Sequence, residues 1–305
     1  MTFNYQLSSF LPFRDAEAAK KARSVKKEDI TKHWNPDFNI RVIEEKADFY
    51  KSFAEDFVGR IRQAREEGRK FVAILPVGPV PQYIEAAKII NAEGLSLDHL
   101  VTFNMDEYAD ENGRTAPAEW EGSFATAMWE NLFERINPEL RPKQQNIHFP
   151  NSDNVNDYSK LIEDEGNADI CYGGIGWSGH IAFWEPQLGA EFNGDLDAYK
   201  AAGSRMVELH PMTIMQNSLH SFGSDWSWVP PKAATIGMRD ILTAKHRSFW
   251  LDGYIGAGIS WQRFIARLVA HGPVSEFVPG SMLQETNADY TILGAVADNV
   301  EINMA

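Results

Sequence analysis

Two adjacent acidic residues, Asp106 and Glu107, directly follow a run of apolar and β-branched side chains. They belong to the hexapeptide Phe-Asn-Met-Asp-Glu-Tyr at residues 103–108. Neighbouring acids at the end of a buried strand would repel each other if both were ionised, so one of them can have a raised pKa and carry a proton. A helix cap or a solvated turn is the alternative interpretation of the same pair.

A second candidate site lies in the glycine-rich segment 173–186, where His180 and Glu185 flank a short apolar turn. An imidazole and a carboxylate form a pair that is suited to proton transfer. The glycines allow the backbone to bend tightly around a small ligand. A buried core histidine is the alternative, but the cluster of glycines favours a functional site.

Other chemistries fit this segment less well. Residues 174–179 spell G-x-G-x-x-G, but a dinucleotide-binding fingerprint opens a long helix, and here Pro186 follows within a few residues. A metal site is disfavoured because no second histidine stands at a ligand spacing. The single cysteine, Cys171, excludes an intrachain disulfide and a multi-cysteine zinc site, and we expect it to be a buried thiol.

A third candidate, the loop 76–81, follows another β-rich run. Gly78 permits a ligand to approach the backbone closely. Pro79 and Pro81 lack N–H groups, and the loop contains neither a hydroxyl nor a lysine, so it is poorly equipped to bind an anion. We expect a rigid turn that shapes one wall of a pocket.

The segments around these residues alternate between strand-like and helix-like patterns. Several strand candidates are apolar almost throughout, which predicts a doubly wound, mostly parallel α/β sheet with ligands at the carboxyl ends of its strands. Residues 1–38 predict an N-terminal extension, residues 39–305 one α/β domain, and residues 223–231 a loop or lid. Strands are expected at residues 71–75, 99–104, 146–149, 169–172, 205–209, 234–237, 248–251 and 291–296, and helices at residues 47–67, 82–92, 119–135, 155–165, 213–219 and 261–270.

The overall composition is that of a globular protein with an acidic surface. Apolar residues make up 44% of the chain, and 29 Lys and Arg residues face 43 Asp and Glu residues, for a net charge of −14. Such a surface repels nucleic acid and anionic lipid, so neither is an expected partner. No segment has the length of a transmembrane helix and no leader pattern is present, so the cytoplasm is the expected compartment.

Residues 101–108 and 173–186 resemble the two signature segments of the glucosamine-6-phosphate deaminase family, whose members are also called isomerases. The resemblance runs from about residue 39 to the end of the chain. It implies a three-layer, Rossmann-like α/β fold and assembly into a homo-oligomer. It also implies a reaction that opens an amino-sugar phosphate ring, moves a proton between C2 and C1 and releases ammonia, without a metal or an organic cofactor.

The resemblance assigns roles to individual residues. Asp106 corresponds to the acid that moves the C2 proton, His180 to the histidine that assists ring opening, and Glu185 to the carboxylate that orients this histidine. A carbon acid beside a carbonyl needs such a base within hydrogen-bonding reach, and the ring oxygen needs a separate proton donor. The residues expected to contact the sugar or sugar phosphate are Gly78, Val80, Glu107, Gly174, Gly176, Trp177, Ser178 and Gly179.

The ring-opening segment departs from the family pattern. Where the family has Asn-Asp before Gly-His, this chain has Trp177 and Ser178. The missing aspartate belongs to the ring-opening set, and a serine cannot supply its charge. The family's asparagine before the orienting glutamate is replaced by Trp184.

The phosphate-binding residues of the family are missing as well. The family's Thr-Gly-Gly-Thr-Pro loop corresponds to residues 77–81, which lack both hydroxyls. The phosphate-binding arginine falls near Leu219, and the binding lysine has no counterpart in residues 253–262. Each charge-assisted hydrogen bond to phosphate contributes roughly 1.5–3 kcal/mol, so their loss would weaken binding of a sugar phosphate by orders of magnitude.

We therefore expect the catalytic residues to be retained in a pocket whose substrate end has been rebuilt. Trp177 and Trp184 would form an aromatic wall for a sugar face, and Arg205, Lys232 or Arg239 could replace the lost anion site. Two other hypotheses stay open. One is a hydrolase similar to 6-phosphogluconolactonase, which shares the fold and a Gly-His segment. The other is a non-catalytic sugar-binding homologue.

Overall fold

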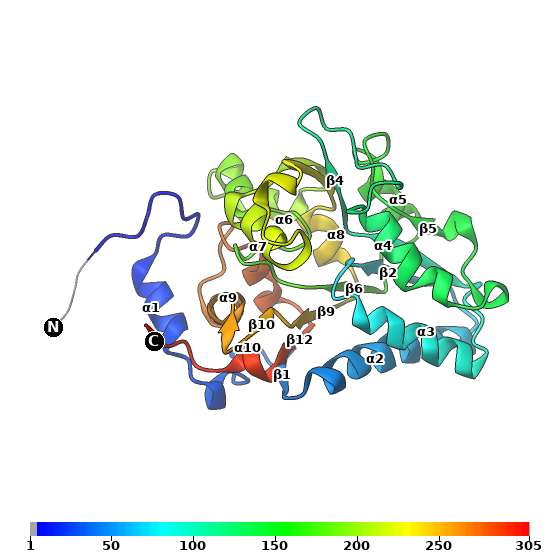
Figure 1. Ribbon diagram of the computed structural model, residues 1–305, viewed down its shortest axis with the longest axis horizontal. Coiled ribbons are helices and arrows are strands. Elements are labelled where there is room, and N and C mark those ends of the chain that lie inside the picture. The colour runs from blue at the N-terminus through cyan, green and yellow to red at the C-terminus, as the bar shows by residue number, and fades with distance from the viewer. Residues whose placement is uncertain (1–4, 305) are drawn as a thin grey trace.

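A parallel seven-stranded sheet forms the centre of the protein, which a computed structural model describes over residues 5–304 (Figure 1). Its strands run in the order β1-β12-β9-β6-β2-β3-β5, and every neighbouring pair is parallel. The structure therefore has the three-layer, Rossmann-like α/β fold that the sequence predicts. The strands are β1 Phe38–Ile43, β2 Phe71–Leu75, β3 Leu100–Asn104, β5 Ile147–His148, β6 Ile170–Gly173, β9 His246–Leu251 and β12 Ala288–Leu293.

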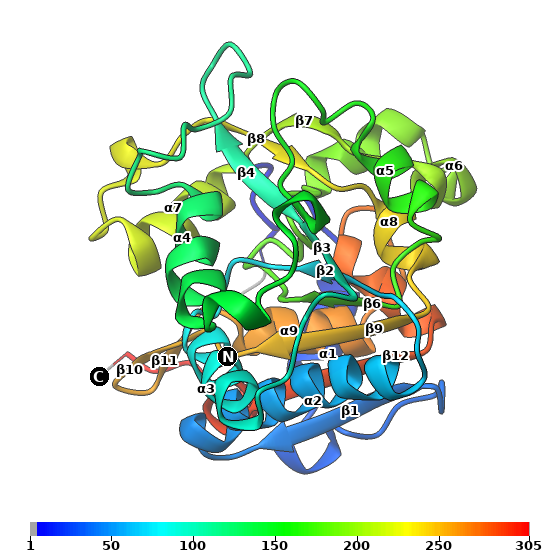
Figure 2. The same cartoon turned by 90° about the vertical axis from the view of Figure 1, so that its right-hand side faces the viewer.

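Helices cover both faces of this sheet. Trp250 on β9 packs against Phe49 and Phe53 of α2, Lys46–Glu66. Phe249, the residue before Trp250 on β9, pairs with Tyr290 on β12. The Tyr290 hydroxyl donates to the Ala266 carbonyl of α9, Arg263–His271. Because successive strand residues point to opposite faces, α2 and α9 lie on opposite sides of the sheet. Both views show α3, Pro81–Glu93, beside α2 (Figures 1 and 2).

A second sheet lies above the carboxyl ends of the central strands, flanked by helices on either side (Figure 2). It contains β4 Asp106–Ala109, β7 Arg205–Glu208 and β8 Lys232–Thr235, and both strand pairs are antiparallel. We expected residues 205–209 and 234–237 to join the parallel sheet, and this expectation is wrong. The reason is β4, which follows β3 after Met105 alone and supplies a new edge against which β8 pairs.

The remaining helices are short, and one predicted helix is broken. Residues 119–135 contain only α4, Phe124–Asn131, followed by a 3₁₀ turn. The Ser123 hydroxyl caps α4, and Gly122 precedes this cap where the Trp120 ring lies against the backbone, so the chain before Ser123 is not helical. The others are α1 Ala16–Ser24, α5 Tyr158–Asp164, α6 Leu196–Ala201, α7 Pro211–Ser221, α8 Met238–Thr243 and α10 Gly294–Ala297, and a two-stranded hairpin is formed by β10 Tyr254–Gly256 and β11 Ile259–Ser260.

The N-terminal segment packs on the outer side of α9, and the backbone N–H of Lys27, shortly after α1, donates to the Asn299 side chain at 3.0 Å (Figure 1). The buried guanidinium of Arg267 donates to the carbonyls of Val25, Arg263 and Ala297 at 2.8, 3.0 and 2.6 Å. One side chain of α9 thereby joins both ends of the chain to the domain. Between residues 5 and 304, no helix combines the length and the apolar character needed to cross a membrane.

We expect Arg267→Met to lower the free energy of unfolding by about 2–5 kcal/mol, because the carbonyls of Val25 and Ala297 lose a charged donor. Urea unfolding followed by circular dichroism measures this change. Arg14→Met is the matched control on an exposed arginine of the N-terminal segment and should stay within about 0.5 kcal/mol of wild type. Equal midpoints for the two variants would show that Arg267 does not fasten the termini.

Candidate active site

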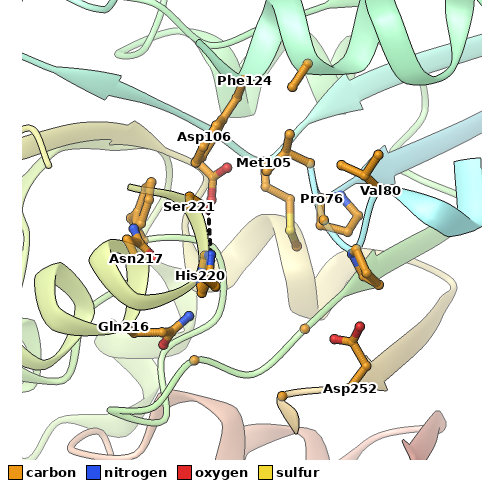
Figure 3. Close-up of a pocket in the computed structure, with 18 of the residues that line it drawn as sticks. Pro76, Val80, Met105, Asp106, Phe124, Gln216, Asn217, His220, Ser221 and Asp252 are labelled. Carbon is orange, nitrogen blue, oxygen red and sulfur yellow. Dashed lines mark hydrogen bonds between the residues drawn. The ribbon is translucent and has the colours of Figure 1, made fainter. Parts of the chain in front are cut away.

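A cavity of about 710 Å³ opens at the carboxyl ends of the central strands (Figure 3). The chain that follows β2, β3, β6 and β9 contributes to its wall, and α4 and α7 close its sides. In a doubly wound sheet this edge is where ligands bind, because the strand ends bring side chains and free backbone groups together. The cavity therefore has the position that the sequence predicts for a site.

Asp106 begins β4 and lies on the cavity wall, although it is only 7% exposed. No residue between 5 and 304 donates a hydrogen bond to its carboxylate. Burial raises the pKa of Asp106 to about 8, and the negative charge of Glu107 adds to this increase. A carboxyl group with such a pKa can take up a proton and return it near neutral pH.

Glu107 points away from the cavity, into the start of α4. Its carboxylate accepts hydrogen bonds from the backbone N–H groups of Tyr108, Phe124 and Ala125 and from the Ser123 hydroxyl, at 2.9–3.0 Å. Burial raises the pKa of Glu107, and these four donors oppose that increase by stabilising its charged form. Glu107 thus caps a helix, which is one of the alternatives that the sequence left open, and it is not part of the cavity wall.

His180 lies on the same cavity wall as Asp106, and Glu185 lies behind it. The imidazole Nδ1 is 2.9 Å from the Ser178 hydroxyl, 3.0 Å from the Thr213 hydroxyl and 3.5 Å from the Glu185 carboxylate. Glu185 is fully buried, and its other oxygen accepts the backbone N–H of His210 at 3.1 Å. Of the three residues predicted to be catalytic, Asp106 and His180 therefore line one cavity, and Glu185 contacts His180 from behind.

Ser178 occupies the space between the histidine and the glutamate. Its hydroxyl donates to the Glu185 carboxylate at 3.3 Å and can accept a hydrogen bond from the N–H at Nδ1 of His180. This direction of donation favours the tautomer with its proton on Nδ1 and leaves Nε2 as an acceptor. A serine at this position cannot supply a charge, but its hydroxyl connects the two groups that a carboxylate would otherwise contact directly.

The glycines of the segment leave room for the imidazole. A Cβ atom on Gly176 would lie 2.0 Å from Nε2 and Cε1 of His180, so only glycine fits beneath the ring. Gly179 has a φ of +90°, in the left-handed region that other residues rarely adopt. At Gly174 the nearest contact of an added Cβ would be the Trp250 carbonyl at an ordinary 3.6 Å.

The predicted binding residues divide into two groups. Gly78, Val80, Gly174 and Gly176 line the cavity, whereas Glu107, Trp177, Ser178 and Gly179 do not. Trp177 acts through its backbone N–H, which donates to the Gln216 side-chain carbonyl at 2.6 Å and so leaves the amide nitrogen of Gln216 for the cavity.

The aromatic wall expected from Trp177 and Trp184 is made by other residues. Trp184 is fully buried beside Phe192 and Tyr199, because the turn after His180 directs it into the core. The aromatic side chains that do line the cavity come from five separate segments of the chain and are Tyr108, Phe124, Phe183, Phe222, Trp228, Trp250, Tyr254 and Trp261.

The basic residues expected to replace an anion site do not reach the cavity. Arg205, Lys232 and Arg239 are absent from its wall, and Arg205 forms an ion pair of 2.8 Å with Glu191. Leu219 is 42% exposed and also lies outside the wall. Of the lysines and arginines between residues 5 and 304, Lys46 alone lines the cavity, together with three acids, Asp106, Glu121 and Asp252.

Sequence reasoning missed most polar residues of the wall, among them Gln216, Asn217, His220 and Asp252. A signal was present for Asp252, which immediately follows β9 just as Asp106 follows β3 and Met105. The residues of α7 gave no signal, because nothing in the sequence shows which face of that helix meets the cavity. Within the described chain, no three His, Cys, Asp or Glu side chains are grouped so that they could hold a metal ion.

Comparisons with known proteins identify glucosamine-6-phosphate deaminases among the relatives of this chain. No protein-family profile matches the sequence. A glucosamine-6-phosphate deaminase of Caenorhabditis elegans is 31% identical over 248 residues, which are 75% of this chain and 85% of the relative. One from Porphyromonas gingivalis is 32% identical over 71% of this chain and 78% of its own length.

Solved structures share the fold at lower sequence identity. A monomeric glucosamine-6-phosphate deaminase of the NagB superfamily superposes with a TM-score of 0.70 at 23% identity, over 85% of this chain and 98% of that protein. The 6-phosphogluconolactonase of Leishmania guyanensis superposes with a TM-score of 0.62 at 14% identity, over 87% and 99% of the two chains.

We expect Gly176→Ala to displace the His180 imidazole, because its Cβ would overlap the ring, and to cost about 1–3 kcal/mol of stability. Imidazole NMR signals assigned to His180 should shift as the ring leaves Ser178 and Thr213. Gly174→Ala is the control, since it meets only an ordinary contact. Unchanged His180 signals in Gly176→Ala would contradict the packing described here.

Asp106 should make stability depend on pH. Its pKa of about 8 in the folded protein lies above the unfolded value near 4, so the folded state retains a proton that the unfolded state releases. The contribution of this group to stability is therefore present below about pH 4 and is lost as the pH rises towards 8. Asp106→Asn should raise the melting temperature more at pH 8 than at pH 5.

Thermal unfolding at the two pH values measures this difference. Asp153→Asn, the same substitution on an exposed loop, is the control and should follow wild type at both. An equal shift of Asp106→Asn at pH 5 and pH 8 would show that the folded-state pKa is not raised.

Proposed function

The chain belongs to the glucosamine-6-phosphate deaminase family, and we propose that it converts an amino sugar without a phosphate into a ketose and ammonia. Support for this reaction comes above all from the wall that Asp106 and His180 share, with Glu185 held behind the histidine. Such a reaction requires two proton transfers. An unpaired carboxylate suits the transfer at carbon, and a separately oriented imidazole suits the transfer to the ring oxygen.

The first step opens the sugar ring. His180 takes the proton of the O1 hydroxyl at Nε2 and delivers a proton to the ring oxygen, so that the bond between C1 and the ring oxygen breaks and an aldehyde forms. The Nδ1 proton, held towards Ser178 and Glu185, keeps the imidazole in the tautomer that this step needs.

The second step moves a proton along the carbon chain. Asp106 removes the C2 proton, which is acidic because C1 is now a carbonyl, and O1 gains a proton released by the ammonium group. Asp106 then returns its proton to C1, which leaves an iminium at C2. Water adds to C2 and ammonia leaves, so that an amino sugar and one water give a ketose and ammonia.

The charge of the cavity supports a substrate without a phosphate. A phosphate dianion would face three acids and one lysine, and the loop 76–81 offers it no hydroxyl. Charged acceptors need charge-assisted donors to replace the water that they lose. Neutral polar groups such as Gln216 and Asn217 are instead suited to sugar hydroxyls.

The two alternative hypotheses receive less support. The lactonase structures share the fold at identities of 14–16%, whereas the deaminases of Caenorhabditis elegans and Porphyromonas gingivalis are 31% and 32% identical. The buried, unpaired carboxylate of Asp106 lowers stability at neutral pH, and a non-catalytic homologue would gain nothing from it in return.

Glucosamine in D₂O tests the proposed reaction. We expect exchange of the C2 hydrogen by proton NMR and ammonia release in a coupled assay, both reduced by about 10²–10⁴-fold in Asp106→Asn. Asp153→Asn should match wild type. Absence of exchange with glucosamine, its 6-phosphate or other amino sugars would favour the binding protein, and hydrolysis of a sugar lactone without ammonia release would favour the hydrolase.

A further inference from the structure

Asp252 lies at the opposite end of the cavity from Asp106, directly after β9. Three strand spacings separate β9 from β3, because β6 and β2 lie between them, so the strand axes are about 14 Å apart. This length accommodates a six-carbon chain of about 8 Å, built from bonds near 1.5 Å, with a hydrogen bond of about 3 Å at each end. The strands β3 and β9, after which the two acids follow, are therefore spaced on the scale of one monosaccharide with its hydrogen bonds.

The Asp252 side chain is held in place from behind. Its Oδ2 accepts the Tyr50 hydroxyl at 2.7 Å, and no other side chain between residues 5 and 304 donates to this carboxylate. Burial raises the pKa of Asp252, whereas the Tyr50 hydroxyl and the charge of Lys46 favour its ionised form. Oδ1 remains available to a ligand in the cavity.

The groups on the other side of the cavity are neutral. Figure 3 shows Gln216 and His220 of α7 facing Asp252 across the open space. The Gln216 oxygen is occupied by the Trp177 N–H, so its amide nitrogen is the free end. Burial lowers the pKa of His220, whose Nδ1 lies 2.6 Å from the Ser221 hydroxyl, and so the imidazole favours its neutral form.

Asp252, Gln216 and His220 are better suited to bind sugar hydroxyls than a phosphate group. A carboxylate is an acceptor only, which suits the O–H donors of a sugar and repels a phosphate, whose oxygens are also acceptors. A neutral imidazole and an amide N–H can donate to sugar oxygens without a charge. Lys46 is the one cation of this end among the described residues, and it is exposed at the start of α2, with its ammonium above the Tyr50 ring.

We propose that Asp252 is a specificity-determining residue that accepts hydrogen bonds from hydroxyl groups at the far end of an unphosphorylated amino sugar and excludes the 6-phosphate. The inference rests on the proposed function for its substrate class. It adds the residue that selects this substrate, and it assigns Tyr50 to the positioning of that residue.

Steady-state kinetics with glucosamine and glucosamine 6-phosphate test this role. We expect wild type to have a kcat/KM at least about 100-fold higher for glucosamine. Asp252→Asn, which can still accept the Tyr50 hydroxyl, should lower kcat/KM for glucosamine by about 10–100-fold, since a charged acceptor becomes a neutral one. The ratio between the two substrates should fall by at least about tenfold, because the repulsion of phosphate is removed.

Two further variants separate charge from position. Tyr50→Phe keeps the charge of Asp252 but releases its carboxylate, so it should raise KM for glucosamine while the rejection of the 6-phosphate persists. Asp48→Asn removes an exposed negative charge from the same helix and should leave both substrates as in wild type. An Asp252→Asn enzyme with the wild-type substrate ratio would overturn the role of Asp252 and leave the proposed reaction intact.

Binding is measured separately in the Asp106→Asn background, where turnover is blocked. Glucosamine should raise the melting temperature of Asp106→Asn more than that of the double variant with Asp252→Asn. Equal shifts of the two variants would overturn the role of Asp252, whether or not wild type turns over either sugar. A lack of turnover by wild type would contradict the proposed function alone. Tight binding of glucosamine 6-phosphate by wild type would contradict both.

Discussion

The burial of an unpaired carboxylate at the point where one sheet gives way to another is the constraint on which the site depends. Asp106 begins β4 at the edge of the cavity, and its neighbour Glu107 must keep its own charge without contacting the same space. The start of α4 satisfies Glu107 with four donors. These donors oppose the increase that burial causes in the pKa of Glu107, and the charge of Glu107 adds to the effect of burial in raising the pKa of Asp106.

A second consequence concerns the histidine. His180 lies against the Gly176 backbone, and its Nδ1 is surrounded by two hydroxyls and a carboxylate on the side away from the cavity. These contacts come from a turn after β6 and from α7, so the ring orientation depends on two elements that the chain brings together from a distance. A serine takes part in this support, because a hydroxyl can both accept from the imidazole and donate to the carboxylate.

The two ends of the cavity are built on different electrostatic principles. At the reacting end a carboxylate is deprived of partners, which raises its proton affinity. At the far end Asp252 receives the Tyr50 hydroxyl and lies near Lys46, both of which favour its ionised form. Burial raises the pKa of both aspartates, but only Asp252 has a hydroxyl donor that opposes the increase. The proposed function assigns the role of proton carrier to Asp106 and that of hydrogen-bond acceptor to Asp252.

The sequence by itself determined the parallel sheet, the two motif segments and the family. Apolar strands and the spacing of glycines are local features, so they can be recognised from neighbouring residues of the sequence. It also placed Asp106, His180 and Glu185 among the candidates. It did not reveal the antiparallel sheet, since β4 follows β3 with one residue between them and its partner β8 lies more than 120 residues further along the chain.

Only the tertiary structure decided which side chains face the cavity. Trp184 and Glu107 turn away from it, and Asp252 and His220 turn towards it. The physical reason is that the direction of a side chain, and with it the solvation of its charge, depends on the packing of distant elements. The residues next to a side chain in the sequence therefore do not show which way it points.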